Sequence, residues 1–437
     1  MAPSQLAPTE ALTKLAQWLP PRNPDADYWW NFTALTLANM LQAGGLNAED
    51  QMEALVFHYH WMVPSLGSSP TSDQAWGAKW IREFGDRNSP VEYSWRWNSS
   101  ATDRPDVRIA LEPMSPFTGT ALDPLNQQAT IELLHRIAAA APATGIDLAW
   151  TNHFLATLFD HDRSKYAQEA AAGVDIRMTI GVAAQWTRSG LGFKTYLLPR
   201  KLGQTGPLLL PVTLWDQAIA QLDPGAEWPA REAIMEFLHN PPAGQQFVPI
   251  LLSVDNTAPT KARLKLYLHS PESSFASIRT VLTLAGQNPI PESGLLALRT
   301  LLCAITGLDP EAYTDDSDLP VTRIFPTTTE QVLPSLTKGA FYQVDIAPGR
   351  RRLDIKVAIH MRAYGVGDDW EVAEAITGWM ETQGRGQYCA GYLDLIKRLT
   401  PDRATRHGMT IQTFVSIMVT ESGELDVNSY FTPEAAE

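Results

Sequence analysis

Cysteine is nearly absent from the sequence: only Cys303 and Cys389 occur among its 437 residues. Two cysteines so far apart cannot supply a disulfide scaffold or a cysteine-rich metal site. The chain also lacks an uncharged apolar run of the roughly 20 residues that a membrane span requires. The first 24 residues lack the basic region and apolar core of a secretion signal. We therefore expect a reduced, soluble, cytoplasmic protein that contacts no membrane.

Positive charge is also scarce. Lys and Arg number 34 against 48 Asp and Glu, which gives a formal net charge of −14. This balance disfavours a nucleic-acid-binding surface. No low-complexity block and no phosphate-cradling glycine loop of the P-loop or dinucleotide type is present. With 44% hydrophobic and 19% charged residues, the chain has the composition of a globular protein with a large core.

A regular alternation of secondary-structure patterns runs through the chain. Segments with helical periodicity precede pairs of segments with period-two alternation, and this order recurs five times. The helical patterns cover residues 27–42, 48–62, 73–84, 124–141, 147–159, 212–222, 229–239, 273–284, 291–306, 368–382 and 387–399. The strand patterns cover residues 91–98, 106–112, 176–185, 191–198, 247–255, 262–269, 340–347, 353–360, 411–420 and 424–431.

The paired strands indicate one closed sheet. Strands joined by short turns must be antiparallel, and ten of them in an open sheet would leave exposed edges. We therefore predict an α/β fold: a closed ten-stranded antiparallel barrel surrounded by helices, built from five helix-helix-strand-strand repeats. It forms a single domain over residues 1–437, in which 1–24 is an N-terminal extension and 432–437 a C-terminal tail. Two or three separate α+β domains are the alternative.

Alternate residues of the strands differ sharply in polarity. In the segment 263–269, leucines occupy one face, while Arg263, Lys265, Tyr267 and His269 occupy the other. A single strand of this kind is explained by a half-buried sheet with one solvated face. In a barrel covered by helices, however, the polar face must line the lumen. That places five cations around one cavity: Arg108, Lys194, Arg263, Lys265 and Lys356.

Such a lumen favours an unusual ligand. Five like charges in a protein of net charge −14 need an anion, and a diphosphate fits because Arg offers a bidentate fork and Lys a point charge. Tyrosines 196, 267 and 430 add electron-rich faces that shield cations, and Glu92 adds a carboxylate. A ligand that splits into a carbocation and a diphosphate accounts for both kinds of side chain.

Short motifs in a fixed order extend over nearly the whole chain. They are Tyr28-Trp29-Trp30, the run 58–67, Val91-Glu92-Tyr93-Ser94, Val107-Arg108-Ile109 with Glu112-Pro113, Lys194-Thr195-Tyr196, the run 263–267 and Thr420-Glu421-Ser422-Gly423. As a set they resemble the fungal aromatic prenyltransferases of the dimethylallyltryptophan synthase family. The resemblance implies an ABBA barrel that transfers a prenyl group from an allylic diphosphate to an electron-rich aromatic carbon or nitrogen in secondary metabolism. It implies a prenyl diphosphate co-substrate and no obligatory metal or other cofactor.

The resemblance also assigns roles to residues. Glu92 is implied as the carboxylate that accepts the indole N–H and assists deprotonation. The five lumen cations are implied to hold the diphosphate, and Tyr196, Tyr267 and Tyr430 to shield the allylic cation. An aromatic small molecule and the allylic diphosphate are then the partners of a monomer or homodimer. A non-catalytic barrel that binds an anionic small molecule is the alternative, and a phosphate-ester hydrolase is a weaker one, since no nucleophile or metal cluster is visible.

Three departures from the family pattern bear on specificity. Ala358 stands where the family has a tyrosine, and Asp426 stands where a second tyrosine would precede Tyr430 by four residues. Cations that grip the carboxylate of free tryptophan are absent at Met178 and Ile250. We therefore expect a neutral indole acceptor such as a tryptophan-containing cyclic dipeptide, with a phenolic or polyketide aromatic as the alternative.

Two further predictions concern the length of the prenyl donor and the absence of a magnesium motif. Loss of a tyrosine ring at Ala358 enlarges the wall beside the prenyl tail, so geranyl diphosphate should be accepted beside the five-carbon donor. An inward-pointing Phe341 could cancel this gain. The aspartates at 315, 316 and 318 lie among prolines and predict a solvated acidic loop, not a magnesium motif.

Overall fold

The computed structural model describes most of the chain. The described residues are 6–70, 89–100, 103–174, 176–204, 210–223, 225–242, 246–322, 338–400 and 411–432. The predicted helix at 73–84 lies outside them.

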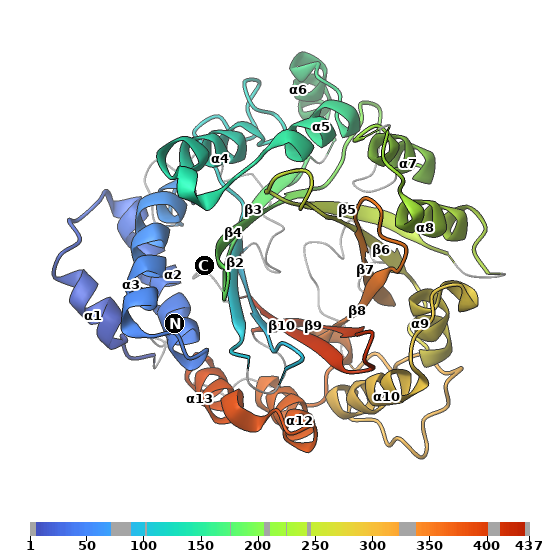
Figure 1. The fold of residues 1–437 in the computed structure, drawn as a ribbon. Helices are drawn as coiled ribbons and strands as arrows, with labels where there is room; N and C mark the ends of the chain where they lie inside the picture. Colours follow the sequence, from blue (N-terminus) through green and yellow to red (C-terminus); the bar gives the residue numbers. More distant parts are fainter. Residues whose placement is uncertain are drawn as a thin grey trace.

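Ten antiparallel strands form a closed barrel, and helices surround it (Figure 1). Around the barrel the order is β1-β10-β9-β8-β7-β6-β5-β4-β3-β2, so consecutive strands are neighbours and β10 closes on β1. This confirms the predicted fold. The strands are β1 (Val91–Arg96), β2 (Asp106–Leu111), β3 (Ile180–Thr187), β4 (Gly190–Leu197), β5 (Val248–Asp255), β6 (Leu264–Ser270), β7 (Ala340–Ile346), β8 (Asp354–His360), β9 (Gln412–Val419) and β10 (Leu425–Phe431).

The helices form the outer layer (Figure 1). None of the described helices is both long and apolar enough to cross a membrane. The α-helices are α1 (Glu10–Ala16), α2 (Pro24–Ala43), α3 (Ala48–Phe57), α4 (Gln128–Ala140), α5 (Ala149–Leu158), α6 (Arg163–Ala171), α7 (Val212–Ala220), α8 (Pro229–His239), α9 (Phe275–Leu282), α10 (Glu292–Thr306), α11 (Met361–Tyr364), α12 (Asp369–Thr382) and α13 (Cys389–Leu399).

The helices differ from the predicted pattern in three places. Helix α1 lies within residues 1–24 and buries Leu12 and Leu15 in the core, and α6 adds a third helix to the second repeat. The predicted helix at 48–62 changes at Phe57 into a π-helical turn, His58–Met62. The turn begins where buried His58 contacts the Thr33 hydroxyl at 2.7 Å and where the Tyr59 hydroxyl donates to the Pro20 carbonyl.

The main core lies between the barrel and the helices. Leu264, Leu266 and Leu268 of β6 are fully buried on the outward face. On β1, the Tyr93 hydroxyl donates to a backbone carbonyl of α2 at 2.9 Å, and the Trp95 ring lies 5.5 Å from a tyrosine ring of α13. Each such side chain contributes roughly 1.5–3 kcal/mol by leaving water. The apolar strand faces therefore point outward, as predicted, and the alternate residues line the lumen.

Strand direction defines the two ends of the barrel. Because the strands alternate in direction, the last residues of β1, β3, β5, β7 and β9 lie beside the first residues of the strands that follow them. We call this the hairpin end. The opposite end, where the chain continues into helices, is the helix end.

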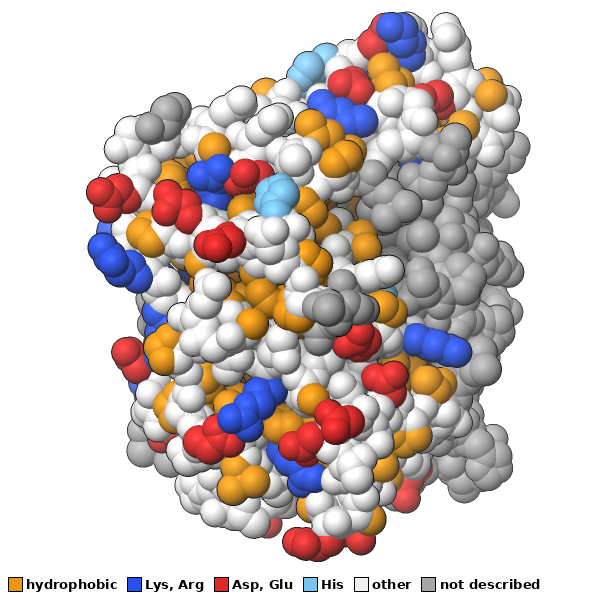
Figure 2. Space-filling view, turned by 90° about the vertical axis from the view of Figure 1, so that its right-hand side faces the viewer, with side chains coloured by type: hydrophobic (Ala, Val, Ile, Leu, Met, Phe, Trp, Pro, Cys, Tyr) orange, Lys and Arg blue, Asp and Glu red, His pale blue; other side chains and the backbone are white. Residues whose placement is uncertain are grey.

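On the face of the molecule in Figure 2, acidic and basic side chains are interspersed instead of gathering by sign.

Packing of α10 against the last hairpin makes Gly294 a sensitive position. A Cβ atom there would lie 2.3 Å from a Val419 methyl group and 2.8 Å from the Gly423 carbonyl oxygen, and the backbone cannot easily shift. We expect Gly294→Ala to lower the free energy of unfolding by about 1–3 kcal/mol, measured by urea denaturation.

The matched control is Gly378→Ala in α12, where a Cβ atom would meet nothing within 4 Å. Alanine in an exposed helix interior is favoured over glycine, so this variant should gain about 0.5–1 kcal/mol. A stabilised Gly294→Ala protein would show that α10 does not pack on the hairpin in this way.

Candidate functional site

The predicted polar faces come together in the lumen. Lys194 lies opposite Asp255 across β4 and β5, and Lys265 lies opposite Asp345 across β6 and β7. On β1, Arg96 shares a face with Glu92 and lies opposite Asp106 of β2. Charged residues at strand ends thus become direct cross-strand neighbours at the hairpin end.

Two aspartates join three of the predicted cations on one side of this end. Asp255 pairs with Lys194 and accepts from Arg263 Nε at 2.7 Å. Asp345 accepts from Arg263 Nη1 at 3.0 Å and from Lys265 Nζ at 2.9 Å. The result is an unbroken chain of alternating charges over β4, β5, β6 and β7.

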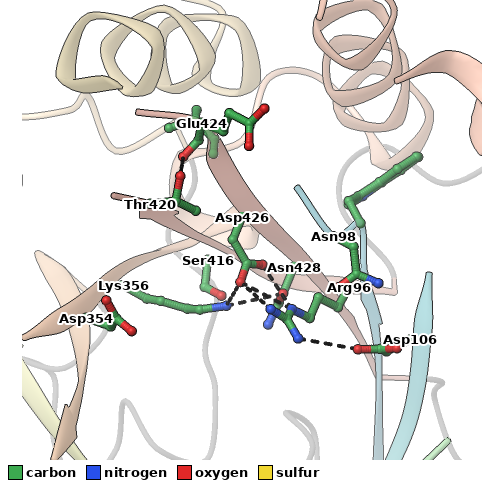
Figure 3. A network of polar contacts seen from close by, with 12 residues as sticks. Arg96, Asn98, Asp106, Asp354, Lys356, Ser416, Thr420, Glu424, Asp426 and Asn428 are labelled. Atoms are coloured by element: carbon green, nitrogen blue, oxygen red, sulfur yellow. Dashed lines mark hydrogen bonds and ion pairs between the residues drawn. The ribbon is translucent and has the colours of Figure 1, made fainter. Parts of the chain in front are cut away.

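A second ion-pair cluster lies on β1, β2, β8 and β10 (Figure 3). One carboxylate oxygen of Asp426 lies 2.8 Å from Arg96 Nη2 and 3.2 Å from Lys356 Nζ. Arg96 also reaches Asp106, with Nη1 3.4 Å from the carboxylate. Lys356 Nζ lies 3.5 Å from the side-chain oxygen of Asn428. Asp426 therefore bridges two cations, where the family pattern had suggested a tyrosine.

These pairs correct the sequence analysis, which treated the lumen cations as a ring of like charges. Four of the five have a carboxylate partner, because an unpaired charge in a closed lumen is costly. Sequence reasoning placed Arg96 on the same strand face as Glu92 but left it out of the set of lumen cations, and it missed Asp106, Asp255 and Asp345. All four follow the same period-two alternation as the cations, so the signal was present.

Arg108 differs from the other predicted cations. Among the residues that the structure describes, no carboxylate lies within ion-pair distance of it. Its guanidinium lies 5.5 Å from the ring centre of Tyr430. Burial alone would lower its pKa, but Tyr196, Tyr430, Tyr267 and Glu92 raise it instead. Arg108 thus occupies the middle of the predicted tyrosine set and stays charged.

Burial lowers the pKa of two amines in the ion-pair clusters. It lowers the pKa of Lys194 to about 8, even though Asp255 acts in the opposite direction. It also lowers the pKa of Lys356, against the influence of Asp426. Burial alone would raise the pKa of Asp255, but Lys194 and Arg263 bring it down to about 2. The Asp255 carboxylate therefore remains ionised at neutral pH.

The three predicted tyrosines lie in the middle of the lumen. The rings of Tyr196 and Tyr267 are 6.4 Å apart at 62°. The Tyr430 oxygen has hydrogen-bonding groups of Gln343, Ser416 and Asn428 at 3.4 Å each. Burial would raise the pKa of Tyr430, but Arg108, Lys356 and the hydrogen bonds lower it to about 7. Burial raises the pKa of Tyr196 to about 12.

Glu92 is the predicted base. It lies on the lumen face of β1, opposite Ala110. Burial raises the pKa of Glu92 to about 8, and the Arg108 charge opposes this rise only partly. In the barrel without ligand the carboxyl group is therefore mostly protonated at neutral pH. Such a group can accept a proton at a reacting centre once it is ionised.

Aromatic rings line the helix end beside Ala358. Phe341 lies directly opposite Ala358 across β7 and β8. The Phe341 ring is 4.9 Å from His269 and 5.5 Å from Phe414, which in turn lies 4.8 Å from His360. Phe341 thus faces the lumen and fills part of the space beside Ala358.

The aspartates at 315, 316 and 318 lie exposed in a loop, as predicted, and two of them have partners within the protein. Asp315 accepts from Arg299 Nε at 2.7 Å, and Asp318 accepts from the Ser273 backbone N–H at 2.7 Å. Within the described ranges, no three His, Cys, Asp or Glu side chains form a group that could hold a metal ion.

Comparisons with known proteins agree with this geometry. The family model "Tryptophan dimethylallyltransferase" matches residues 25–395. Prenyltransferase anuH of Penicillium roqueforti is 48% identical, with 98% of this chain and 93% of the relative covered. Xanthone prenyltransferase A of Emericella nidulans is 40% identical, with 93% of this chain and 92% of the relative covered.

Solved structures share the fold. AnaPT from Neosartorya fischeri superposes with a TM-score of 0.77 at 21% identity, and the match covers 98% of this chain and 100% of that one. The resemblance drawn from the sequence is confirmed, and the chain is a prenyltransferase enzyme. It belongs to the tryptophan dimethylallyltransferase family.

Proposed function

We propose that this enzyme transfers a prenyl group from an allylic diphosphate to a hydroxylated aromatic acceptor. One observation carries the proposal: a single lumen holds cations at the hairpin end, tyrosine faces in the middle and a buried carboxylate, Glu92, on the same strand face as Arg96 but toward the helix end. Cleavage of the donor requires the first two groups, and proton removal from the acceptor requires the third.

Different lumen residues act on different steps of the proposed reaction. Arg108, Lys194, Arg263, Lys265 and Lys356 hold the diphosphate, which keeps the electron pair of the broken allylic C–O bond. Fixed cations stabilise the negative charge that develops there. The faces of the three tyrosines shield the allylic cation. An electron pair of the arene then forms the new bond to the allylic carbon, and Glu92 takes up the proton that the acceptor loses.

The acceptor assignment rests on two supports. Relatives at 40% and 38% identity are named xanthone prenyltransferases, and a xanthone contains a ring oxygen but no indole N–H. The second support is that β5 around Ile250 contains no cation that could hold the carboxylate of a free amino acid, although the buried cation Arg177 lies next to Met178. A tryptophan-containing cyclic dipeptide is the competing acceptor, because it too lacks the free amino acid carboxylate that a cation on β5 would hold. Cytoplasmic location and a monomeric or homodimeric state stay predictions.

An acceptor panel tests the proposal. With dimethylallyl diphosphate, we expect diphosphate release and a prenylated product with hydroxyxanthones, at higher kcat/KM than with a tryptophan-containing cyclic dipeptide or L-tryptophan. Activity should persist in EDTA, because protein cations neutralise the diphosphate. Lys265→Gln should lower kcat by roughly 100-fold, the scale for one lost charge-stabilising group.

The control is Arg279→Gln, which removes an exposed ion pair with Glu292 in the helical layer. It should leave the kinetics unchanged. A clear preference for the cyclic dipeptide would contradict the acceptor assignment, and complete loss in EDTA with rescue by magnesium would contradict the role of the cations.

Glu92 should show opposite effects on stability and activity. Its folded pKa of about 8 exceeds the ordinary value of 4.5, so the folded state holds a proton that the unfolded state loses as the pH rises. The carboxyl group therefore costs stability increasingly from pH 4.5 to pH 8, and this cost is constant above pH 8. Glu92→Gln should raise Tm more at pH 8 than at pH 6 while abolishing most prenyl transfer. A Tm difference that does not depend on pH would mean that Glu92 is not buried as a neutral acid.

Donor length should depend on Ala358 and Phe341 together. Ala358 carries only a methyl group where the family pattern has a tyrosine ring, and Phe341 lies opposite it across β7 and β8, so we expect geranyl diphosphate to be accepted beside dimethylallyl diphosphate. Ala358→Tyr should reduce kcat/KM for the ten-carbon donor more than for the five-carbon donor in a direct competition. An unchanged ratio would show that Ala358 does not line the tail pocket.

A further inference from the structure

Carboxylates occupy the spaces between lumen cations at the hairpin end. The clearest case is Asp426, which is 2% exposed. One of its two carboxylate oxygens, Oδ2, lies 2.8 Å from Arg96 and 3.2 Å from Lys356. A phosphoryl oxygen between the same two cations would make the same contacts. Asp426 thus resembles a bound anion in both charge and position (Figure 3).

We propose that Arg96 is a further diphosphate-binding residue and that Asp426 is its exchangeable counter-ion, which the diphosphate displaces. This inference rests on the proposed role of the lumen cations in holding the donor. It makes two separate claims, one for a residue that attracts the diphosphate and one for a residue that competes with it.

The position of Arg96 supports the first claim. Its side chain is on the lumen face of β1 and is 40% exposed, as is the side chain of Arg263, whereas that of Lys356 is only 7% exposed. Burial acts to lower the pKa of Arg96, but Asp426 and Asp106 raise it on balance; the charge of Arg263 also opposes this rise, so the two guanidinium groups are close enough to interact. Arg96 and Arg263 therefore lie at the solvent-exposed mouth, where an anionic donor meets the cations first.

The charges around Asp426 support the second claim. Lys356 and Arg96 outweigh burial and hold the pKa of Asp426 well below its usual range, so the carboxylate cannot be neutralised at assay pH. A diphosphate carries more charge than one carboxylate and more oxygens for the Arg fork, so it can displace Asp426. Arg96 keeps a second carboxylate partner in Asp106 at 3.4 Å, which limits the cost of losing Asp426. Asp426 consequently weakens diphosphate binding by occupying its cations.

The other possible role for Asp426 is to position Arg96 and Lys356 for the diphosphate. The two roles predict opposite results when the charge is removed. If Asp426 competes, Asp426→Asn tightens diphosphate binding; if it positions the cations, the same substitution weakens binding.

Inorganic diphosphate, tested as a competitive inhibitor against dimethylallyl diphosphate, is the probe. We expect Asp426→Asn to lower its Ki by on the order of tenfold and Arg96→Gln to raise Ki by a similar factor, the scale of one charge-assisted hydrogen bond. The charge-balanced double variant Arg96→Gln/Asp426→Asn should bind near the wild-type level. KM for the donor should follow Ki, while KM for the acceptor stays constant. Arg279→Gln again serves as the control for a lost ion pair.

Three results would overturn the inference. Weaker binding by Asp426→Asn would show that Asp426 positions the cations, and an unchanged Ki in Arg96→Gln would place Arg96 outside the site. If Asp426→Asn does not fold, Asp106→Asn replaces it with a smaller expected decrease in Ki, and an unchanged value counts against the proposal. Lys265→Gln distinguishes a failure of the proposed function from a failure of this inference. If Lys265→Gln leaves Ki unchanged, the proposed diphosphate site itself is wrong. If Lys265→Gln raises Ki but Arg96→Gln does not, only the further inference is refuted.

Discussion

Charges enclosed in the barrel must be balanced, and this constraint explains where most of the charged side chains of the lumen lie. Transfer of a charged side chain out of water costs several kcal/mol unless a partner compensates for it. In a closed sheet the partner must come from another strand, so Asp255, Asp345 and Asp426 each lie between two cations. The lumen is thus prepared for an anion and yet nearly neutral without one.

The antiparallel order separates the chemistry along the barrel axis. Even-numbered strands begin, and odd-numbered strands end, at the hairpin end, and there the chain carries Arg96, Asp106, Asp255, Asp345 and Asp426 at or next to strand termini. Glu92 and Phe341, near the starts of odd-numbered strands, lie toward the helix end. Alternating strand direction is therefore sufficient to place the ion-pair clusters and Glu92 in different regions of one cavity.

The sequence was sufficient for the barrel and for the face of each strand, because the period-two pattern is local and the leucines of β6 permit only one orientation. It located Arg108, Lys194 and Glu92 for the same reason. Ion pairs were harder, since the contact between Lys356 and Asp426 spans β8 and β10 with Met418 of β9 between them. Such a contact depends on register and barrel shear, which no local pattern specifies. The π-helical turn at 58–62 was missed, and it coincides with a tertiary contact to α2 that no local pattern specifies.

Glu92 and Tyr430 respond differently to Arg108, their common neighbour. Burial dominates at Glu92 and raises its pKa to about 8, whereas Arg108 and Lys356 prevail over burial at Tyr430 and lower its pKa to about 7. A diphosphate on these cations adds negative charge, which opposes ionisation of both groups. Tyr430 then becomes a neutral phenol whose hydroxyl donates a hydrogen bond. In the proposed reaction, positive charge that forms nearby lowers the pKa of Glu92 again, so the allylic cation itself would favour the ionised form of this carboxyl group. The acid–base state of the lumen is therefore linked to the charge separation that the reaction creates.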